Sequence, residues 1–346
     1  MCNIAGYVGE KNAAPLLIEM IKQQEGYNGG YYTGIATLHE GKIYYAKLTG
    51  DTDRLLALTD AAKLPGRIGI IHSRTKSGGG DEWAHPFLGY REGTPFCAYV
   101  ANGGVGCFAS RGTEFNEMAQ ALFEQGYPLH SRVAIEPPAY IQLKDGASVH
   151  MSDVMCQMIV RQLRTCNDQA RAMEAAFCEM PSEIVGLLLS LDTPDRITYS
   201  RFNLPMSVGF APHGAYLASS PMAFPADAGE PSLLPANSCG YIYADRACTM
   251  PMKHPPKAVA HLSAEIVDRA YHAVKAVLEE RETIFSVLSN EVVKPLFTGE
   301  DLRPNAALVY QVLLALKKEG LLQERIDTLP GVFPELTAPK VKMKIG

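Results

Sequence analysis

The chain opens on a cysteine that leads straight into an apolar segment, and this opening restricts the fold more than any other feature. Residues 1–9 read Met-Cys-Asn-Ile-Ala-Gly-Tyr-Val-Gly. Removal of Met1 would give Cys2 both a thiol and a free α-amine, and an amine that titrates near pH ~8 can accept the thiol proton. Taken alone, a cysteine in this setting is more often an inert, buried thiol. The opening therefore predicts a buried strand with a candidate nucleophile at its start.

The composition is typical of a soluble globular protein and excludes several classes of partner. The 346 residues are 47% hydrophobic and 20% charged, with a formal net charge of −5. Such a chain is not drawn to nucleic acid by its overall charge. No basic and apolar leader precedes Cys2, and no stretch approaches the ~20 apolar residues of a membrane span. We expect a cytoplasmic protein without nucleic-acid or membrane partners, and a homo-oligomer is compatible with these features.

Eight cysteines raise the question of a metal site. None of them lies in a Cys-x-x-Cys pair, and no histidine sits at ligand spacing beside two of them. This spacing favours reduced, mostly buried thiols over zinc binding. We therefore expect neither a metal ion nor another cofactor.

Strand and helix patterns alternate through the first two thirds of the chain, and helical patterns follow. The segment 250–256 is rich in proline, which interrupts both helices and strand pairing. Beyond it, apolar residues recur at helical spacing over residues 259–277 and 305–320. We predict an α+β domain over residues 2–250 and a small helical C-terminal domain, resembling a winged helix, over residues 251–346.

Three further segments carry chemically useful side chains. In residues 70–86, an apolar strand delivers Arg74 to a glycine-rich loop that contains Ser77 and ends in Ala-His-Pro. A second strand ends in Asn102-Gly103, and residues 149–153 place Asp153 ahead of an apolar helix. Taken singly, each has a simpler interpretation: a surface arginine, a hairpin turn and a helix cap.

In this order and with these spacings, the motifs resemble the class II glutamine amidotransferases, whose glutaminase domains use an N-terminal nucleophile. The motifs are similar to those of the glutaminase domain of glucosamine-6-phosphate synthase, and the resemblance spans about residues 2–225. It implies a four-layer αββα sandwich. It also implies glutamine as the substrate, hydrolysed through a glutamyl thioester on Cys2.

The resemblance implies a role for each motif residue. Cys2 would be the nucleophile, and the Asn102 side chain with the Gly103 backbone N–H would stabilise the oxyanion. Arg74 and Ser77 would bind the α-carboxylate of glutamine, for which a planar guanidinium is well suited. Asp153 would bind the α-ammonium group, and Gly103 would also contact the substrate. We interpret His72 and His85 as structural.

The sequence departs from the family pattern at four positions. Asn3 replaces a glycine after the nucleophile, and Asn28 stands where the family has an arginine that organises the oxyanion asparagine. Thr75 and Gly78 replace an aromatic residue and a histidine of the glutamine loop. These changes predict lower activity or a different amide preference.

Three functions are consistent with these features. About 90 residues follow the proline-rich boundary, too few for a phosphosugar or phosphoribosyl domain, so the ammonia is expected to pass to a separate synthase subunit. One alternative is an inactive or weakly active binding protein of the same fold. The other is a cysteine acylase for another amide, but Arg74 paired with Asp153 favours glutamine.

Overall fold

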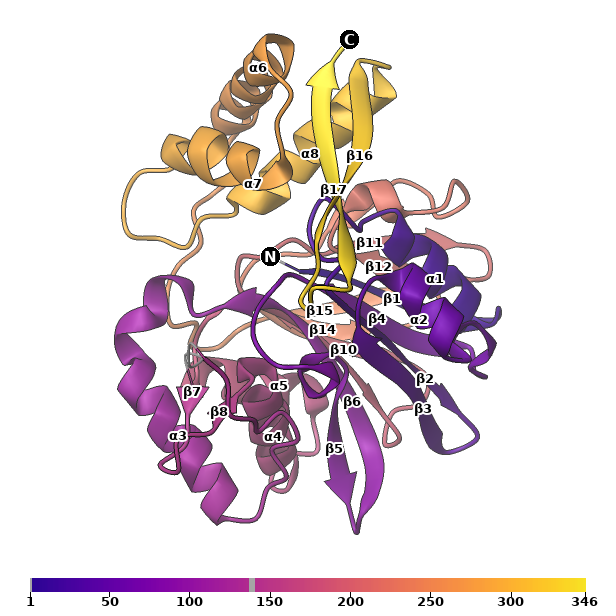
Figure 1. Ribbon diagram of the computed structural model, residues 1–346, viewed down its shortest axis with the longest axis vertical. Helices are drawn as coiled ribbons and strands as arrows, with labels where there is room; N and C mark the ends of the chain where they lie inside the picture. The colour runs from indigo at the N-terminus through magenta and orange to yellow at the C-terminus, as the bar shows by residue number, and fades with distance from the viewer. Residues whose placement is uncertain (1, 137–140) are drawn as a thin grey trace.

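The computed structural model describes residues 2–136 and 141–346. Two antiparallel sheets form its centre (Figure 1). The first has the order β13-β11-β12-β1-β4-β2-β3 and the second the order β15-β14-β10-β9-β6-β5. The strands of the first sheet are β1 (Asn3–Gly9), β2 (Tyr32–His39), β3 (Lys42–Thr49), β4 (Ile68–Arg74), β11 (Ser207–Ala211), β12 (Gly214–Ala218) and β13 (Ser232–Leu233). Those of the second are β5 (Phe87–Arg91), β6 (Thr94–Gly104), β9 (Glu183–Ser190), β10 (Ile197–Arg201), β14 (Ser238–Ile242) and β15 (Ala247–Pro251).

A continuous apolar core fills the space between the two sheets. Side chains alternate between the two faces of a strand, so every second residue of a strand contributes to this core. In β1 these residues are Ile4 and Val8, which join Ile70 of β4 and Val100 of β6 in one buried cluster. Whether a residue occupies an odd or an even position in its strand therefore decides which side of the sheet its side chain faces.

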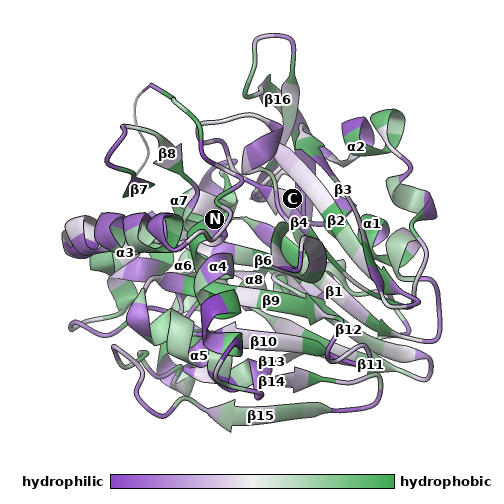
Figure 2. Ribbon diagram, turned by 90° about the horizontal axis from the view of Figure 1, so that it is seen from below, coloured by the Kyte–Doolittle hydropathy of each residue, from purple (hydrophilic) through white to green (hydrophobic). Residues whose placement is uncertain are grey.

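Helices cover the outer face of each sheet, which confirms the predicted four-layer αββα sandwich (Figure 2). Helices α1 (Ala13–Lys22) and α2 (Thr52–Leu58) pack on the first sheet, and α4 (Met151–Leu163) and α5 (Gln169–Glu179) pack on the second. Helix α3 (Gly112–Glu124) lies beside α4, next to the short strands β7 (Ile141–Gln142) and β8 (Ser148–Val149).

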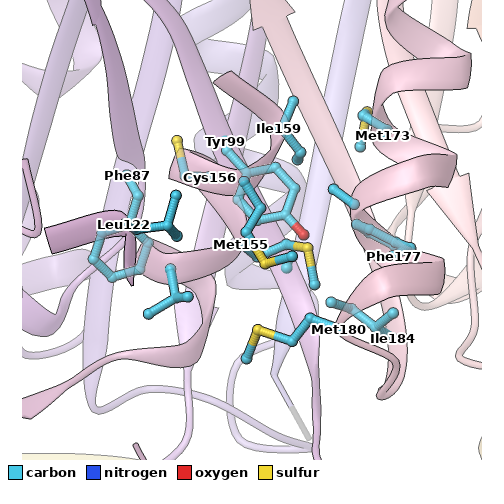
Figure 3. Close-up of a cluster of buried hydrophobic side chains, with 14 of the residues drawn as sticks. Phe87, Tyr99, Leu122, Met155, Cys156, Ile159, Met173, Phe177, Met180 and Ile184 are labelled. Atoms are coloured by element: carbon cyan, nitrogen blue, oxygen red, sulfur yellow. The ribbon is translucent and has the colours of Figure 1, made fainter. Parts of the chain in front are cut away.

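The core under α4 and α5 is densely packed with aromatic and sulfur-containing side chains. Figure 3 shows Met155 and Cys156 of α4, Phe177 of α5 and Tyr99 of β6 among the side chains of this cluster. All four are buried. This packing holds α4, and with it the first-turn residue Asp153, firmly against the sheet.

The C-terminal segment, residues 251–346, is not wholly helical. It contains α6 (Ala264–Glu280), α7 (Phe285–Val287), irregular helical turns over residues 288–296, and α8 (Asn305–Lys318). These are followed by a hairpin of β16 (Leu322–Pro330) and β17 (Thr337–Ile345), which the sequence analysis did not predict. In Figure 1 the hairpin descends from the segment toward the sheets.

Within residues 2–136 and 141–346, no helix is both long and apolar enough to cross a membrane.

Candidate active site

The predicted site residues gather where β1 begins and β4 and β6 end. Strand β1 pairs with β4 so that Ile4 lies opposite His72. Because Ile4 faces the core between the sheets, strand parity directs Cys2 and Arg74 toward the same interior space. Asn102 shares the parity of Val100 and approaches from the second sheet.

A cavity of about 520 Å³ opens at this point. Its walls include four predicted residues: Cys2, Arg74, Ser77 and Gly103. Asn102 and Asp153 do not line the cavity, but each is buried beside a neighbour in sequence that does.

Cys2 is held at the cavity wall by its backbone. Its nitrogen donates a 2.8 Å hydrogen bond to Oδ1 of Asn102, and its Sγ lies 3.8 Å from Oγ1 of Thr75. Burial opposes ionisation of the thiol, but the His72 side chain and the charge of Arg74 outweigh it and lower the pKa of Cys2 to about 6. A thiolate is therefore available at neutral pH, as a nucleophile requires.

His72, which the sequence analysis interprets as structural, is also among the groups that lower the pKa of the Cys2 thiol. It is completely buried, stacks on His85 with 3.8 Å between ring centroids, and its Nε2 lies 2.9 Å from the carbonyl oxygen of Ala101. Because a carbonyl only accepts, Nε2 carries a proton and donates it to Ala101, so a hydrogen bond from His72 to the Cys2 thiolate can come only from a proton on Nδ1. Among the described residues, Nδ1 has no hydrogen-bond partner.

Asn102 and Gly103 lie inside β6, not in the hairpin turn that the dipeptide alone suggests. The backbone N–H of Cys2 can only donate, so it fixes Oδ1 of Asn102 as its acceptor and leaves Nδ2 as the free donor. That Nδ2 is buried and has no partner in the part of the chain described. A Cβ at Gly103 would lie 2.7 Å from the Glu183 carbonyl oxygen, so only glycine fits there.

Arg74 is buried, not a surface arginine. Its guanidinium lies 4.8 Å from the ring centroid of Tyr32 and 5.3 Å from that of Trp83, and it donates to the Trp83 carbonyl. Within the described ranges it forms no ion pair, and burial lowers the pKa of Arg74. A buried cation without an anion at a cavity wall is suited to an anionic ligand. The two aromatic partners were not predicted.

Asp153 lies in the first turn of α4 but does not cap the helix, since the His150 side chain accepts the hydrogen bond from Ser152. Oδ2 of Asp153 accepts from both the backbone nitrogen and the hydroxyl of Ser131, each at 2.7 Å. Oδ1 is buried and finds no partner in residues 2–136 and 141–346. Burial raises the pKa of Asp153.

Two of the family departures change the cavity wall. Thr75 brings a hydroxyl near Sγ of Cys2 in place of an aromatic ring. Gly78 leaves room for Ile135, whose Cδ1 would lie 2.4 Å from a Cβ at position 78. The wall near the glutamine loop is therefore apolar, and Ser77 remains exposed beside it.

The described site combines one acid, one cation and one thiol, which is not a metal-ligand set. No group of three or more metal-ligating side chains occurs in the described parts of the chain.

Comparison with known sequences finds relatives over about two thirds of the chain. A glutamine–fructose-6-phosphate aminotransferase (isomerizing) from Pyrococcus horikoshii is 28% identical over 226 residues, which are 65% of this chain and 33% of the relative. The enzyme of the same name from Caldanaerobacter subterraneus subsp. tengcongensis is 30% identical over 221 residues, 63% of this chain and 31% of the relative. The chain thus spans about a third of the length of these curated relatives. No family model matches it.

Comparison with solved structures shows the fold. A glutamine phosphoribosylpyrophosphate amidotransferase from B. subtilis, complexed with ADP and GMP, aligns with a TM-score of 0.57 and 16% identity over 77% of this chain and 52% of that one. A structure of the allosteric regulatory enzyme of purine biosynthesis aligns with a TM-score of 0.58 and 15% identity. The alignment covers 90% of this chain and 63% of that one. Together, the comparisons confirm the resemblance to class II glutamine amidotransferase domains.

Proposed function

We propose that residues 2–250 form a glutamine amidotransferase domain that hydrolyses glutamine to glutamate and ammonia. One observation carries the proposal: a low-pKa thiol and a guanidinium line one cavity, and a buried amide donor and a carboxylate oxygen lie beside it, the last three without an ionic or hydrogen-bond partner of the needed kind among the described residues. The proposal includes the cytoplasmic location predicted from the sequence.

Glutamine recognition would use the two unpaired charges. Arg74 presents its fork to the α-carboxylate, with the Ser77 hydroxyl beside it, and Oδ1 of Asp153 accepts from the α-ammonium group. Because a simple amide lacks both charged groups, this pairing supports glutamine over the substrates of a general cysteine acylase. The side-chain amide would then extend toward Cys2.

The chemistry would proceed through a thioester. The Cys2 thiolate attacks the side-chain carbonyl carbon, and the oxyanion is stabilised by Nδ2 of Asn102 and the backbone N–H of Gly103. The α-amine of Cys2, freed by removal of Met1, holds the proton lost by the thiol and delivers it to the leaving nitrogen as the carbon–nitrogen bond breaks, which releases ammonia. Water then cleaves the thioester, giving up a proton to the same amine, and releases glutamate and the free thiol.

The ammonia would pass to a separate synthase subunit. The curated relatives carry the name of an aminotransferase that uses fructose 6-phosphate, and this chain spans about a third of their length. The C-terminal segment, residues 251–346, is proposed as an appendage of the amidotransferase domain.

The test is glutamine hydrolysis by protein whose mature N-terminus has been verified by mass spectrometry. We expect equimolar glutamate and ammonia from the wild type and none from Cys2→Ala, while Cys248→Ala, which changes an exposed thiol, keeps full activity. A processed wild-type protein that is inert with glutamine, both alone and with a synthase from a neighbouring gene, would favour the inactive binding protein instead.

A further inference from the structure

The side chain next to the nucleophile is held by an unusually complete set of hydrogen bonds. Asn3 follows Cys2 but faces the opposite side of β1, where it is completely buried. Its Nδ2 donates to the carbonyl oxygens of Gln24 at 2.7 Å and Asn28 at 2.6 Å. Because carbonyls only accept, these two contacts fix the orientation of the amide and direct Oδ1 the other way.

Oδ1 of Asn3 meets a hydroxyl from the far end of the chain. Tyr310 of α8 lies 3.2 Å from it, and the same hydroxyl lies 3.0 Å from Nδ2 of Asn28. A hydroxyl can donate once while accepting, so Tyr310 accepts from Asn28 and donates to Asn3. Two of the four departures from the family pattern, Asn3 and Asn28, thus share one hydroxyl of the C-terminal segment.

The Tyr310 ring is fixed in place by its own packing. It is 1% exposed, and its ring centroid lies 4.2 Å from that of Phe285 and 6.4 Å from that of Tyr27. Burial raises the pKa of Tyr310 well above its ordinary value, so the hydroxyl keeps its proton across the working pH range. The donor to Asn3 is therefore permanent while α8 is docked.

A second contact secures the loop that carries Asn28. The backbone nitrogen of Val341 in β17 donates to the Gly26 carbonyl at 2.9 Å. On the other side, the Gly30 nitrogen donates to the hydroxyl of Ser73, the residue opposite Asn3 in the β1–β4 ladder. The loop is clamped between the C-terminal segment and the strand pair that presents Cys2.

We propose that Tyr310 is a positioning residue for Cys2, so that docking of the C-terminal segment, through its hydroxyl and Asn3, sets the geometry of the nucleophile. This inference rests on the proposed glutamine hydrolysis. The route is short, since Asn3 is bonded directly to Cys2.

The test is Tyr310→Phe, which keeps the ring and removes only the hydroxyl. Loss of the donor lets Asn3 turn, and small misplacements of reacting groups are costly, so we expect kcat for glutamine to fall about 10-fold with KM within about 2-fold. Tyr271→Phe is the matched control, because the hydroxyl of Tyr271 in α6 donates to the exposed Glu319, far from Cys2 at the start of β1. It should behave as the wild type.

Two further measurements distinguish positioning of Cys2 from a purely structural role of Tyr310. The pH midpoint for alkylation of Cys2 by iodoacetamide should rise in Tyr310→Phe and stay unchanged in Tyr271→Phe, measured below the unfolding temperature of each variant. In an Asn3→Ala background, adding Tyr310→Phe should lower kcat no further, because the hydroxyl acts through Asn3. Unchanged kcat and midpoint in Tyr310→Phe, or fully additive losses in the double variant, would overturn the inference.

The alkylation experiment with iodoacetamide does not require that glutamine is the substrate. If the wild type fails to hydrolyse glutamine, the proposed function fails, while the midpoint shift alone still decides whether Tyr310 positions the thiol.

Discussion

The backbone nitrogen of Cys2 donates a 2.8 Å hydrogen bond to Oδ1 of Asn102, a residue one hundred positions away. The bond crosses from the first sheet to the second and joins the candidate nucleophile to the candidate oxyanion donor. It also determines which end of the Asn102 amide is free, because Oδ1 is occupied, whereas Nδ2 has no partner among residues 2–136 and 141–346. The same contact would hold the α-amine of Cys2 after removal of Met1.

Replacing Asn102 should damage catalysis more than binding. In Asn102→Ala the oxyanion loses its side-chain donor, so we expect kcat to fall by about 10²- to 10³-fold with little change in KM. Steady-state kinetics with glutamine measure both parameters, and a thermal melt checks that the variant is folded. A variant that loses affinity but keeps its kcat would assign Asn102 to glutamine binding.

The pH dependence of Cys2 should reveal its charged neighbours. A thiol pKa of about 6 means that the reactive thiolate forms as pH rises through 6, so the alkylation rate should level off near neutrality. His72→Gln removes the imidazole but keeps a donor for the Ala101 carbonyl, and we expect the midpoint to move up toward the ordinary ~8.5. Peptide mapping of alkylated Cys2 across pH measures this. An alkylation midpoint near pH ~8.5 in the wild type would contradict the claim that His72 lowers the pKa of Cys2.

Asp153 should affect affinity for glutamine. In Asp153→Asn the amide can still accept from Ser131, but an NH₂ group then faces the substrate's α-ammonium. The loss of a charged hydrogen bond predicts a KM increase of about 10- to 100-fold with kcat nearly unchanged. The KM measured with glutamine checks this prediction.

The wild type should show a matching pH effect. Burial raises the pKa of Asp153, so its carboxylate is lost on acidification earlier than that of an exposed aspartate. KM should therefore rise as pH falls through this pKa, and it should be flat in Asp153→Asn over the same range. Parallel pH profiles for the two proteins would contradict the assignment.

Arg201 should matter for stability. Its guanidinium is completely buried and donates to the backbone carbonyls of Leu204, Asn203 and Leu234, and burial lowers the pKa of Arg201 to about 10. Arg201→Ala removes the donor from these carbonyls, and we expect the free energy of unfolding to fall by about 3 kcal/mol. Urea denaturation measures the change. A loss below about 0.5 kcal/mol, usual for surface sites, would show that other donors replace the guanidinium.

The two sheets and the order of the site motifs could be predicted from the sequence because their signals are local. Apolar strands such as residues 67–73 and 95–101 coincide with β4 and β6. The motif residues lie at strand ends, where parity carries them to one space. The hairpin β16–β17 was also detectable, since residues 340–345 alternate lysine with apolar side chains at the period of a strand. It was not predicted because the helical spacing over residues 259–277 and 305–320 dominates the C-terminal segment.

Other features depend on contacts that no local pattern encodes. Tyr310 and Asn28 are 282 positions apart, and nothing near either residue indicates a partner. The sequence around His72 indicates only an apolar strand. His72 lies near Cys2 because β1 and β4 pair in a register that sets His72 opposite Ile4. Burial of Arg74 between Tyr32 and Trp83 likewise follows from tertiary packing. Tyr32 begins β2, and the whole β2–β3 hairpin separates it in sequence from Arg74 at the end of β4.

The most direct test of the central claim is covalent capture of the nucleophile. A glutamine analogue in which a diazoketone replaces the side-chain amide should alkylate the attacking sulfur, and peptide mass spectrometry then identifies the labelled residue. We predict a single label on Sγ of Cys2, in a peptide that begins with that cysteine, and protection by excess glutamine. A label on Cys107 or Cys248, both exposed, or no glutamine-protected label at all, would contradict the account.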